Sequence, residues 1–147
     1  NAKFGLPEIK LGALPGSGGT VRITRRIGIG RVSELMLLGD MVDAQQALAW
    51  GYANRIAPKG ETLAHAHEIA GKLASGAKQA MCDAKQALRY GMYLPEEQAI
   101  AKLLAVIDVL SRTQDIHEGA DAFINKRPPN FSDPLDTTKI VGCIFPK

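Results

Sequence analysis

Apolar side chains recur at three- and four-residue steps through most of the chain, the spacing that places them on one face of an α-helix. The pattern is clearest in the later part of the chain, where it predicts helices at residues 61–75, 77–90, 95–110 and 115–125. Gly76 separates the first two helices, Pro95 suits a first helical position, and Pro128-Pro129 ends the last helix. Each stripe must be buried against something, so the sequence predicts a packed helical array.

The first third of the chain is mixed. Residues 2–14 are predicted as strand and loop, because apolar positions alternate with turn residues and Pro7 cannot donate to a strand ladder. A loop over residues 15–20 then leads into a helix that Gly28 interrupts. Two short helices and a short extended run follow, at residues 31–38, 44–50 and 52–57. Asp43 has the position and side chain of an N-cap for the second of these helices.

Composition excludes several function classes. Of 147 residues, 46% are hydrophobic and 22% charged, as in an ordinary globular protein, and the low aromatic content of 5% favours a helix-packed core. A net charge of +3 is too small and too scattered to indicate a nucleic-acid partner. No apolar run approaches the length that spans a bilayer, so no membrane partner is expected. Cys82 and Cys143 match no metal-ligand spacing, which favours free thiols in a reducing compartment.

Glu8 is the first candidate for chemistry. It is a single carboxylate in an apolar, turn-rich run, flanked by Leu6, Pro7, Ile9 and Leu11. If that run packs, the carboxylate loses solvation and its pKa rises toward the range of a general acid or base. The alternative is a surface glutamate in a loop, which composition alone favours.

A glycine-rich turn, Pro15-Gly16-Ser17-Gly18-Gly19-Thr20, follows Glu8 and shifts the balance toward chemistry. Its glycines leave backbone amides uncovered at a predicted helix start, where the helix dipole favours an anion or the oxygen of a bound water. The turn lacks the Lys-Ser/Thr pair of a phosphate-binding loop and the βαβ context of a dinucleotide fingerprint. The alternative explanation for these glycines is a tight turn with close helix packing.

Basic side chains give weaker signals. Arg22, Arg25 and Arg26 share one helix face, which indicates either a solvated surface or attraction of an acidic or phosphorylated ligand. The chain has 3 histidines, and their spacing matches no metal-ligand signature, so no metal site is expected.

Three blocks of the sequence resemble the enoyl-CoA hydratase/isomerase (crotonase) family. They are FGLPEIKLGALPGSGGTVRITRRIG from Phe4, LLGDMVDAQQALAWGYANRIAP from Leu37 and EGADAFINKRPPNF from Glu118. The resemblance covers residues 2–131 and has the order and spacing of the C-terminal portion of family members. It implies an α/β crotonase-like (ClpP/crotonase) fold, truncated to a mostly α-helical chain with a short strand and loop part at its N-terminus.

The resemblance also implies four site residues. Glu8 matches the second of two glutamates that hold a water and move protons in the hydratases, and Gly16 matches the glycine whose amide helps to hold that water. Phe123 and Lys126 match residues that reach the CoA nucleotide of a neighbouring subunit. The family takes acyl-CoA, needs no metal or separate cofactor because CoA is part of the substrate, and forms homo-oligomers that are trimers or dimers of trimers.

The same resemblance implies that the chain is incomplete as an enzyme. In the family, the first glutamate and both oxyanion-hole amides lie upstream of the matching region. We therefore expect a parent protein that adds water to trans-2-enoyl-CoA, as a lyase, and an isolated chain that is inactive. Two alternatives stay open: a Δ3,Δ2-enoyl-CoA isomerase, for which one glutamate suffices, and a non-catalytic helical oligomerisation module, which would cover the apolar helix stripes.

The expected organisation and location also follow the family. Residues 1–58 would be the end of the ββα core, residues 59–131 a helical oligomerisation region, and residues 132–147 an irregular tail without a counterpart in the family. The expected role is fatty-acid β-oxidation, either in the bacterial cytoplasm or in mitochondria.

Overall fold

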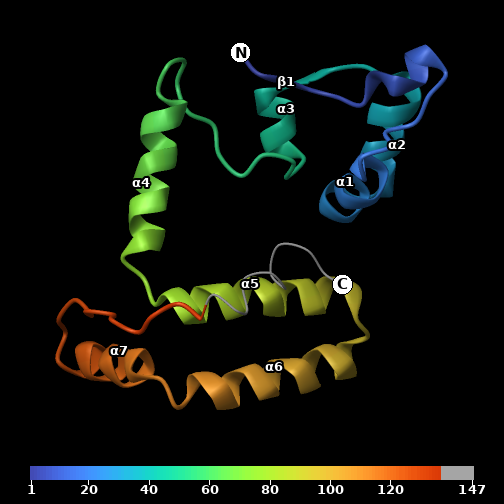
Figure 1. The fold of residues 1–147 in the computed structure, drawn as a ribbon. Coiled ribbons are helices and arrows are strands. Elements are labelled where there is room, and N and C mark those ends of the chain that lie inside the picture. The colour runs from blue at the N-terminus through green and yellow to red at the C-terminus, as the bar shows by residue number, and fades with distance from the viewer. Residues whose placement is uncertain (137–147) are drawn as a thin grey trace. The chain divides into compact units, whose positions relative to one another are not determined.

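A computed structural model describes residues 1–136, and Figure 1 traces their elements along the chain. The chain divides into two compact units, residues 1–66 and 67–147, and helix α4 (Thr62–Ala74) runs across the boundary between them. Helices predominate in the described residues, as the sequence predicts, and the two strands are only two residues long each.

Unit 1 contains a two-stranded antiparallel sheet and four short helical elements. Strand β1 (Lys3–Phe4) pairs with β2 (Val42–Asp43). The 3-10 helix η1 (Pro7–Leu11), α1 (Gly19–Ile27) and α2 (Ile29–Leu38) lie between the strands in sequence, and α3 (Ala44–Ala49) follows β2. Asp43 caps α3 as predicted, because its carboxylate accepts a hydrogen bond from the Gln46 N–H at 2.8 Å.

One predicted strand or loop segment is helical. Pro7 fixes its own φ at a helix-compatible value at the start of η1, and Gly12, with φ 69°, ends the element. The Gly12 N–H donates to the Ile9 carbonyl at 3.0 Å and the Ala13 N–H donates to the Glu8 carbonyl at 3.0 Å. Glu8 therefore lies on a short rigid turn of helix rather than in a loop.

In the predicted extended run, residues 52–54 form bends and residues 55–57 have no regular secondary structure, so no strand is present there. Its start is held by a side chain rather than by a strand ladder, because Arg26 Nε donates to the carbonyls of Gly51 and Tyr52 at 3.1 and 3.0 Å.

Strand β2 was not predicted. A two-residue strand is defined by its distant partner β1, and no local periodicity reveals it.

The core of unit 1 lies where η1 and α1 pack against α2. Its buried side chains come from the segment before η1 and from both helices: Leu6, Ile23, Ile27, Val32 and Leu35. The Phe4 ring meets the Tyr52 ring edge to face, with centroids 5.3 Å apart. This small core fixes η1, and with it Glu8, against α2.

Unit 2 is a helical hairpin followed by a third helix and a returning segment. Helices α5 (Lys78–Tyr93) and α6 (Glu96–Leu110) lie side by side, and α7 (Gln114–Ile124) follows (Figure 1). Residues 125–136 then return to the helices. Asp115 on α7 accepts hydrogen bonds from the N–H groups of Ser132 and Asp133, and Asp133 accepts one from the Asp115 N–H.

The apolar stripes of the long helices are only partly covered within the chain. Leu88 on α5 is 73% exposed and Leu104 on α6 is 60% exposed.

Among the described residues, no helix combines the length and hydrophobicity that crossing a membrane requires. Residues 132–136 of the predicted irregular tail have no regular secondary structure, and the rest of that tail, with Cys143, lies outside the described residues. The predicted division at residues 58 and 131 stays a prediction.

Candidate active-site wall

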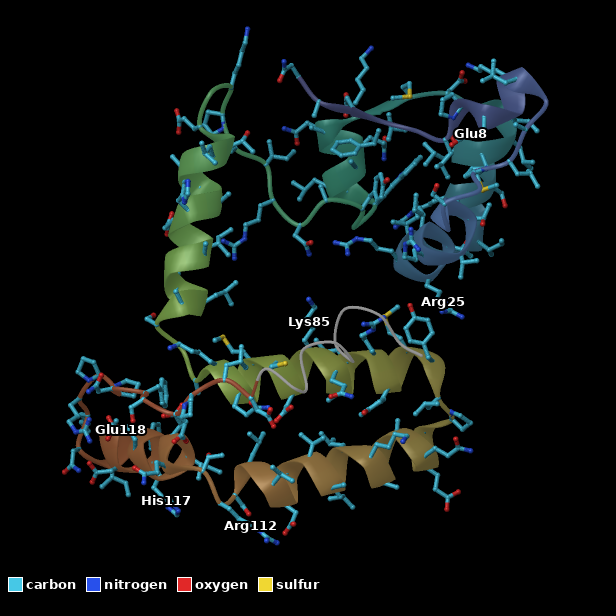
Figure 2. All side chains as sticks on the ribbon, in the orientation of Figure 1. Glu8, Arg25, Lys85, Arg112, His117 and Glu118 are labelled. Carbon is cyan, nitrogen blue, oxygen red and sulfur yellow. The ribbon has the colours of Figure 1, made fainter. Side chains whose placement is uncertain are left out.

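The carboxylate of Glu8 is half-buried on η1, which packs beside α2 (Figure 2). Its Oε2 atom is buried and has no hydrogen-bond partner among the described residues. Buried polar atoms are nearly always paired, so this oxygen is still free to accept a hydrogen bond within the described residues. It is an acceptor available to a ligand or a substrate water.

The apolar surroundings of Glu8 are narrower than the sequence suggests. Leu6 is 8% exposed and belongs to the core, but Leu11 is 85% exposed and Ile9 is 39% exposed. The turns of η1 point successive side chains in different directions, so only one flank of Glu8 packs inward. Within this chain, the hydrophobic enclosure expected around the carboxylate is therefore one-sided.

The three glycines of the turn at residues 15–20 differ in their backbone conformation and in the space around their Cα atoms. Gly18 has φ 82°, a conformation that side chains rarely adopt. A Cβ at Gly19 would lie 3.2 Å from Pro15 Cβ and 3.3 Å from Leu6 Cδ2, so close packing accounts for that glycine. Gly16 has neither reason, because its φ is outside the left-handed region and a Cβ there would meet no described atom within 4 Å.

Packing brings the glycine turn against the segment that carries Glu8. Leu6 lies two residues before Glu8, and its Cδ2 lies 3.3 Å from the position that a Cβ on Gly19 would take, at the start of α1. The first turn of α1 has glycine at its N-cap and no side-chain cap, so the positive end of the helix dipole is left to other acceptors. The segment before η1 therefore packs against the start of α1, and both η1 and α1 pack against α2.

The arginine face of α1 has a structural use that the sequence did not reveal. Arg26 Nε donates to two carbonyls after α3, and its guanidinium also reaches Asn54 Oδ1. Arg22 donates to the Ser17 carbonyl in the glycine turn. These two side chains therefore fasten loops, and Arg22, Arg25 and Arg26 are all exposed, in agreement with the predicted solvated face. The partners of Arg26 lie 25 to 28 residues further along the chain, so local spacing gives no signal of these contacts.

The other two predicted site residues lie at the end of α7 in unit 2. Phe123 is 86% exposed, and Lys126 is exposed two residues beyond the helix. Lys126 has φ 51°, which makes it the single non-glycine residue with positive φ in the described part of the chain. The pair therefore presents an apolar ring and a cation on the surface of this unit.

An ion cluster beside Lys126 was missed by sequence reasoning. Arg127 donates from Nη1 and Nη2 to the two carboxylate oxygens of Glu118, at 2.7 and 2.8 Å, and from Nη2 to Asp121. The Asn130 N–H donates to Glu118 at 2.6 Å. We call this set, Glu118, Asp121, Arg127 and the Asn130 amide, the Arg127 clamp; Figure 2 labels Glu118 on α7. Glu118 and Arg127 are nine residues apart, a spacing that no helical or strand rule pairs.

The clamp strongly favours the charged forms of its members. The hydrogen bonds from Arg127, and next the Asn130 amide, lower the pKa of Glu118 from 4.5 to about 2. The hydrogen bonds to Glu118 and Asp121 raise the pKa of Arg127 above its ordinary value. The Glu118 side chain is 24% exposed and that of Arg127 is 40% exposed, so the cluster lies partly in solvent.

A surface pocket of unit 2 is lined by the clamp members Glu118, Asp121 and Asn130, and a separate cavity lies elsewhere in the unit. A cavity of about 100 Å³ lies between α5, α6 and α7, and its lining includes Gln79, Leu110 and Asp115. Asp115 is 6% exposed, and its Oδ2 has no hydrogen-bond partner among the described residues.

Within residues 1–136, no group of three or more His, Cys, Asp or Glu side chains is arranged to hold a metal ion.

Comparison with known proteins gives a consistent result. A family model described as enoyl-CoA hydratase/isomerase matches residues 1–134. The 2,3-dehydroadipyl-CoA hydratase of Escherichia coli strain K12 is 40% identical over 131 residues, which cover 89% of this chain and 51% of that protein. The crotonyl-CoA hydratase of Syntrophomonas wolfei is 36% identical over 131 residues, covering 89% of this chain and 50% of that protein.

Solved structures agree in fold. An enoyl-CoA hydratase from Geobacillus kaustophilus matches with a TM-score of 0.85 and 39% identity, over 88% of this chain and 49% of that one. An enoyl-CoA hydratase from Bacillus anthracis matches with a TM-score of 0.86 and 34% identity, over 89% of this chain and 51% of that one. The chain spans about half the length of the curated relatives it matches.

Proposed function

Because this chain belongs to the enoyl-CoA hydratase/isomerase family, we propose that it carries one wall of an active site that adds water across the double bond of a trans-2-enoyl-CoA. The observation that carries the proposal is the buried Oε2 of Glu8, which has no hydrogen-bond partner among the described residues, and the open surroundings of Gly16 support it. The family resemblance implies a role for the same two residues.

In the proposed reaction, Glu8 acts on the water. Its Oε2 accepts a proton of the water while the water oxygen bonds to C3 of the enoyl group, and a proton is returned to C2. The carbon–carbon π bond breaks, and its electrons pass through the thioester enolate to form the new C2–H bond. Hydration changes no overall oxidation level, so this proposal includes no redox cofactor, and CoA enters only as part of the substrate.

Gly16 supplies room and a backbone amide in this proposal. Gly16 has no side chain, so the water can approach its backbone closely. The space that a Cβ would occupy at Gly16 has no described atom within 4 Å. The open end of the α1 dipole adds a positive potential that favours the water oxygen as it becomes nucleophilic. Glu8 and the turn at Gly16 would then hold the water from two sides.

The proposal assigns CoA recognition to unit 2. Lys126 offers a cation for a CoA phosphate, and the exposed Phe123 ring offers an apolar surface. In the family such residues serve a neighbouring subunit, so we further propose a homo-oligomer, a trimer or a dimer of trimers, in either the bacterial cytoplasm or mitochondria. The exposed apolar side chains of α5 and α6, among them Leu88 and Leu104, support association, because contiguous exposed apolar patches commonly mark protein–protein interfaces.

The chain alone is proposed to be inactive. It spans about half of its curated relatives, and the resemblance places the oxyanion donors and the first glutamate in their other half. Loss of a single oxyanion donor typically costs ~100-fold or more in rate. An efficient site therefore requires that other half.

The experiment joins the two halves. The 147 residues replace the matching half of the E. coli 2,3-dehydroadipyl-CoA hydratase, and the fusion is assayed for hydration of crotonyl-CoA. We expect measurable turnover, and we expect Glu8→Gln to lower kcat by at least ~100-fold with a smaller change in KM, since general acid–base catalysis contributes this much. A Glu8→Gln fusion with unchanged kcat contradicts the role of Glu8.

The same fusion separates the alternatives. Conversion of a trans-3-enoyl-CoA to the trans-2 isomer, without hydration, would replace the hydratase proposal by the isomerase. If the fusion folds and associates by light scattering but neither reacts with nor binds acyl-CoA, the helical oligomerisation module becomes the better description.

A further inference from the structure

Lys126 adopts a conformation that needs outside support. A non-glycine residue with positive φ is strained, and such strain persists where the surrounding structure fixes it. Asparagine or glycine is the usual choice just beyond a helix end, because both adopt left-handed geometry more easily. Here Asn125 precedes the left-handed position and a lysine occupies it, so the strained site carries a cationic side chain.

The chain on both sides of Lys126 is fastened to α7. The Asn125 N–H donates to the Asp121 carbonyl at 2.9 Å, and the Arg127 N–H donates to the Ala122 carbonyl at 3.0 Å. The side chain of Arg127 then reaches back to Glu118 and Asp121. Beyond the turn, the Asn130 N–H joins the same Glu118 carboxylate.

From this geometry we infer that Arg127 is a positioning residue, whose clamp holds Lys126 in its left-handed turn and thereby aims the lysine ammonium at a phosphate of the CoA nucleotide. The inference rests on the proposed role of Lys126 in CoA binding. Arg127 itself is committed to Glu118 and Asp121, so it acts through the backbone of Lys126 rather than on the ligand.

The clamp uses features that only arginine provides. The planar guanidinium donates to both oxygens of one carboxylate while a further N–H reaches Asp121, and a lysine ammonium cannot reproduce this fork. The Asn130 amide occupies Glu118 as well, so the carboxylate links α7 to both ends of the segment after Lys126. Arg127→Lys therefore keeps the charge and removes the geometry.

The test is a double-mutant cycle in the full 147-residue chain. The probe is 3′-phosphoadenosine 5′-diphosphate, the nucleotide half of CoA, titrated while the backbone amide resonances of residues 123–130 are followed by NMR. We expect Lys126→Ala and Arg127→Lys each to weaken binding about tenfold, as expected for loss of a charge-assisted hydrogen bond or its geometry. In the Lys126→Ala background, Arg127→Lys should change binding less than about twofold, because no ammonium remains to be aimed.

Two further variants control the cycle. Arg112→Lys alters an exposed arginine that pairs with Asp108 in the same unit, and it should leave probe binding unchanged. Glu118→Gln removes the clamp from its other side and should weaken binding like Arg127→Lys, which covers the case in which one variant fails to fold. Equal losses from Arg127→Lys in both backgrounds, or no loss in either, would overturn the positioning role.

A second readout separates this inference from the proposed function. The Cα and Hα chemical shifts of Lys126 report its left-handed backbone without any ligand. If Lys126→Ala does not affect probe binding, Lys126 does not contact the CoA nucleotide. The claim that Arg127 directs the Lys126 ammonium to a phosphate is then rejected as well. The holding role stands if Arg127→Lys shifts Lys126 out of the left-handed region and is overturned if the left-handed shifts persist.

Discussion

The glycines in the turn at residues 15–20 are required for different physical reasons. Gly18 is set by its backbone angle and Gly19 by the side chains of Leu6 and Pro15. Gly16 answers to neither demand within this chain, and its open surroundings are what a backbone that approaches a ligand requires. Neither a left-handed backbone, as at Gly18, nor close side-chain packing, as at Gly19, accounts for the glycine at position 16. Its proposed role in holding a water is compatible with both findings.

Alanine substitutions at these glycines should separate stability from activity. Gly16→Ala is expected to change the free energy of unfolding of the chain by less than about 0.5 kcal/mol, yet to lower kcat of the fusion about tenfold or more by displacing the water. Gly19→Ala should cost about 1 kcal/mol, because its Cβ would crowd Leu6 and Pro15 at 3.2–3.3 Å. Urea titration and the hydration assay measure the two effects; a strongly destabilised Gly16→Ala chain would refute the distinction.

The Arg127 clamp makes one part of the stability dependent on acid. The pKa of Glu118 is about 2 in the folded chain and 4.5 ordinarily, mainly because Arg127 donates hydrogen bonds to it. A depressed carboxyl pKa stabilises the fold above pH 4.5, and this stabilisation is lost as the pH falls from about 4.5 to about 2. The other charged members facing Glu118 are Arg127 and, through it, Asp121.

Glu118→Gln should therefore flatten the acid limb of the stability curve. Urea midpoints are measured from pH 6 to pH 2 for both proteins, and the wild type should lose more stability than the variant between pH 4.5 and pH 2. Asp108→Asn, which removes the exposed pair with Arg112, is the matched control. Parallel curves for wild type and Glu118→Gln would show that the clamp does not couple protonation to folding.

At the scale of elements, local pattern predicted the helices and failed where a distant partner decides. The predicted helices at residues 61–75 and 115–125 correspond to α4 and α7, because their apolar periodicity and end signals are local. η1 was predicted as strand or loop, since alternation over so few residues does not distinguish a strand from a 3-10 turn. β2 and the Arg26 contacts depend on residues far along the chain, which periodicity does not report.

Helix α2 offers a direct check on the core of unit 1. Leu35 is 2% exposed and Leu37 is 68% exposed, on the same short helix. Leu35→Ala should destabilise the chain by about 2–5 kcal/mol through lost burial and a residual cavity, whereas Leu37→Ala should stay within about 0.5 kcal/mol. Chemical denaturation measures both; equal effects would mean that α2 does not present Leu35 to the core.

At the scale of the whole molecule, the family and the fold were predictable and the details of the site were not. The crotonase-like, mostly helical fold is confirmed by solved relatives, because several sequence blocks in a fixed order specify it. The unpartnered oxygen of Glu8 and the Arg127 clamp appear only when distant residues are placed in space. The roles of Glu8, Gly16, Phe123 and Lys126 stay predictions until activity is measured.

The central claim is that this chain holds one wall of a hydratase site and that the other wall lies elsewhere. The most direct measurement is the rate of crotonyl-CoA hydration by the 147-residue chain alone, beside the same chain fused to the complementary half of the E. coli relative. We expect turnover by the fusion and, from the isolated chain, a rate at least ~100-fold lower. Equal rates from the two would contradict it.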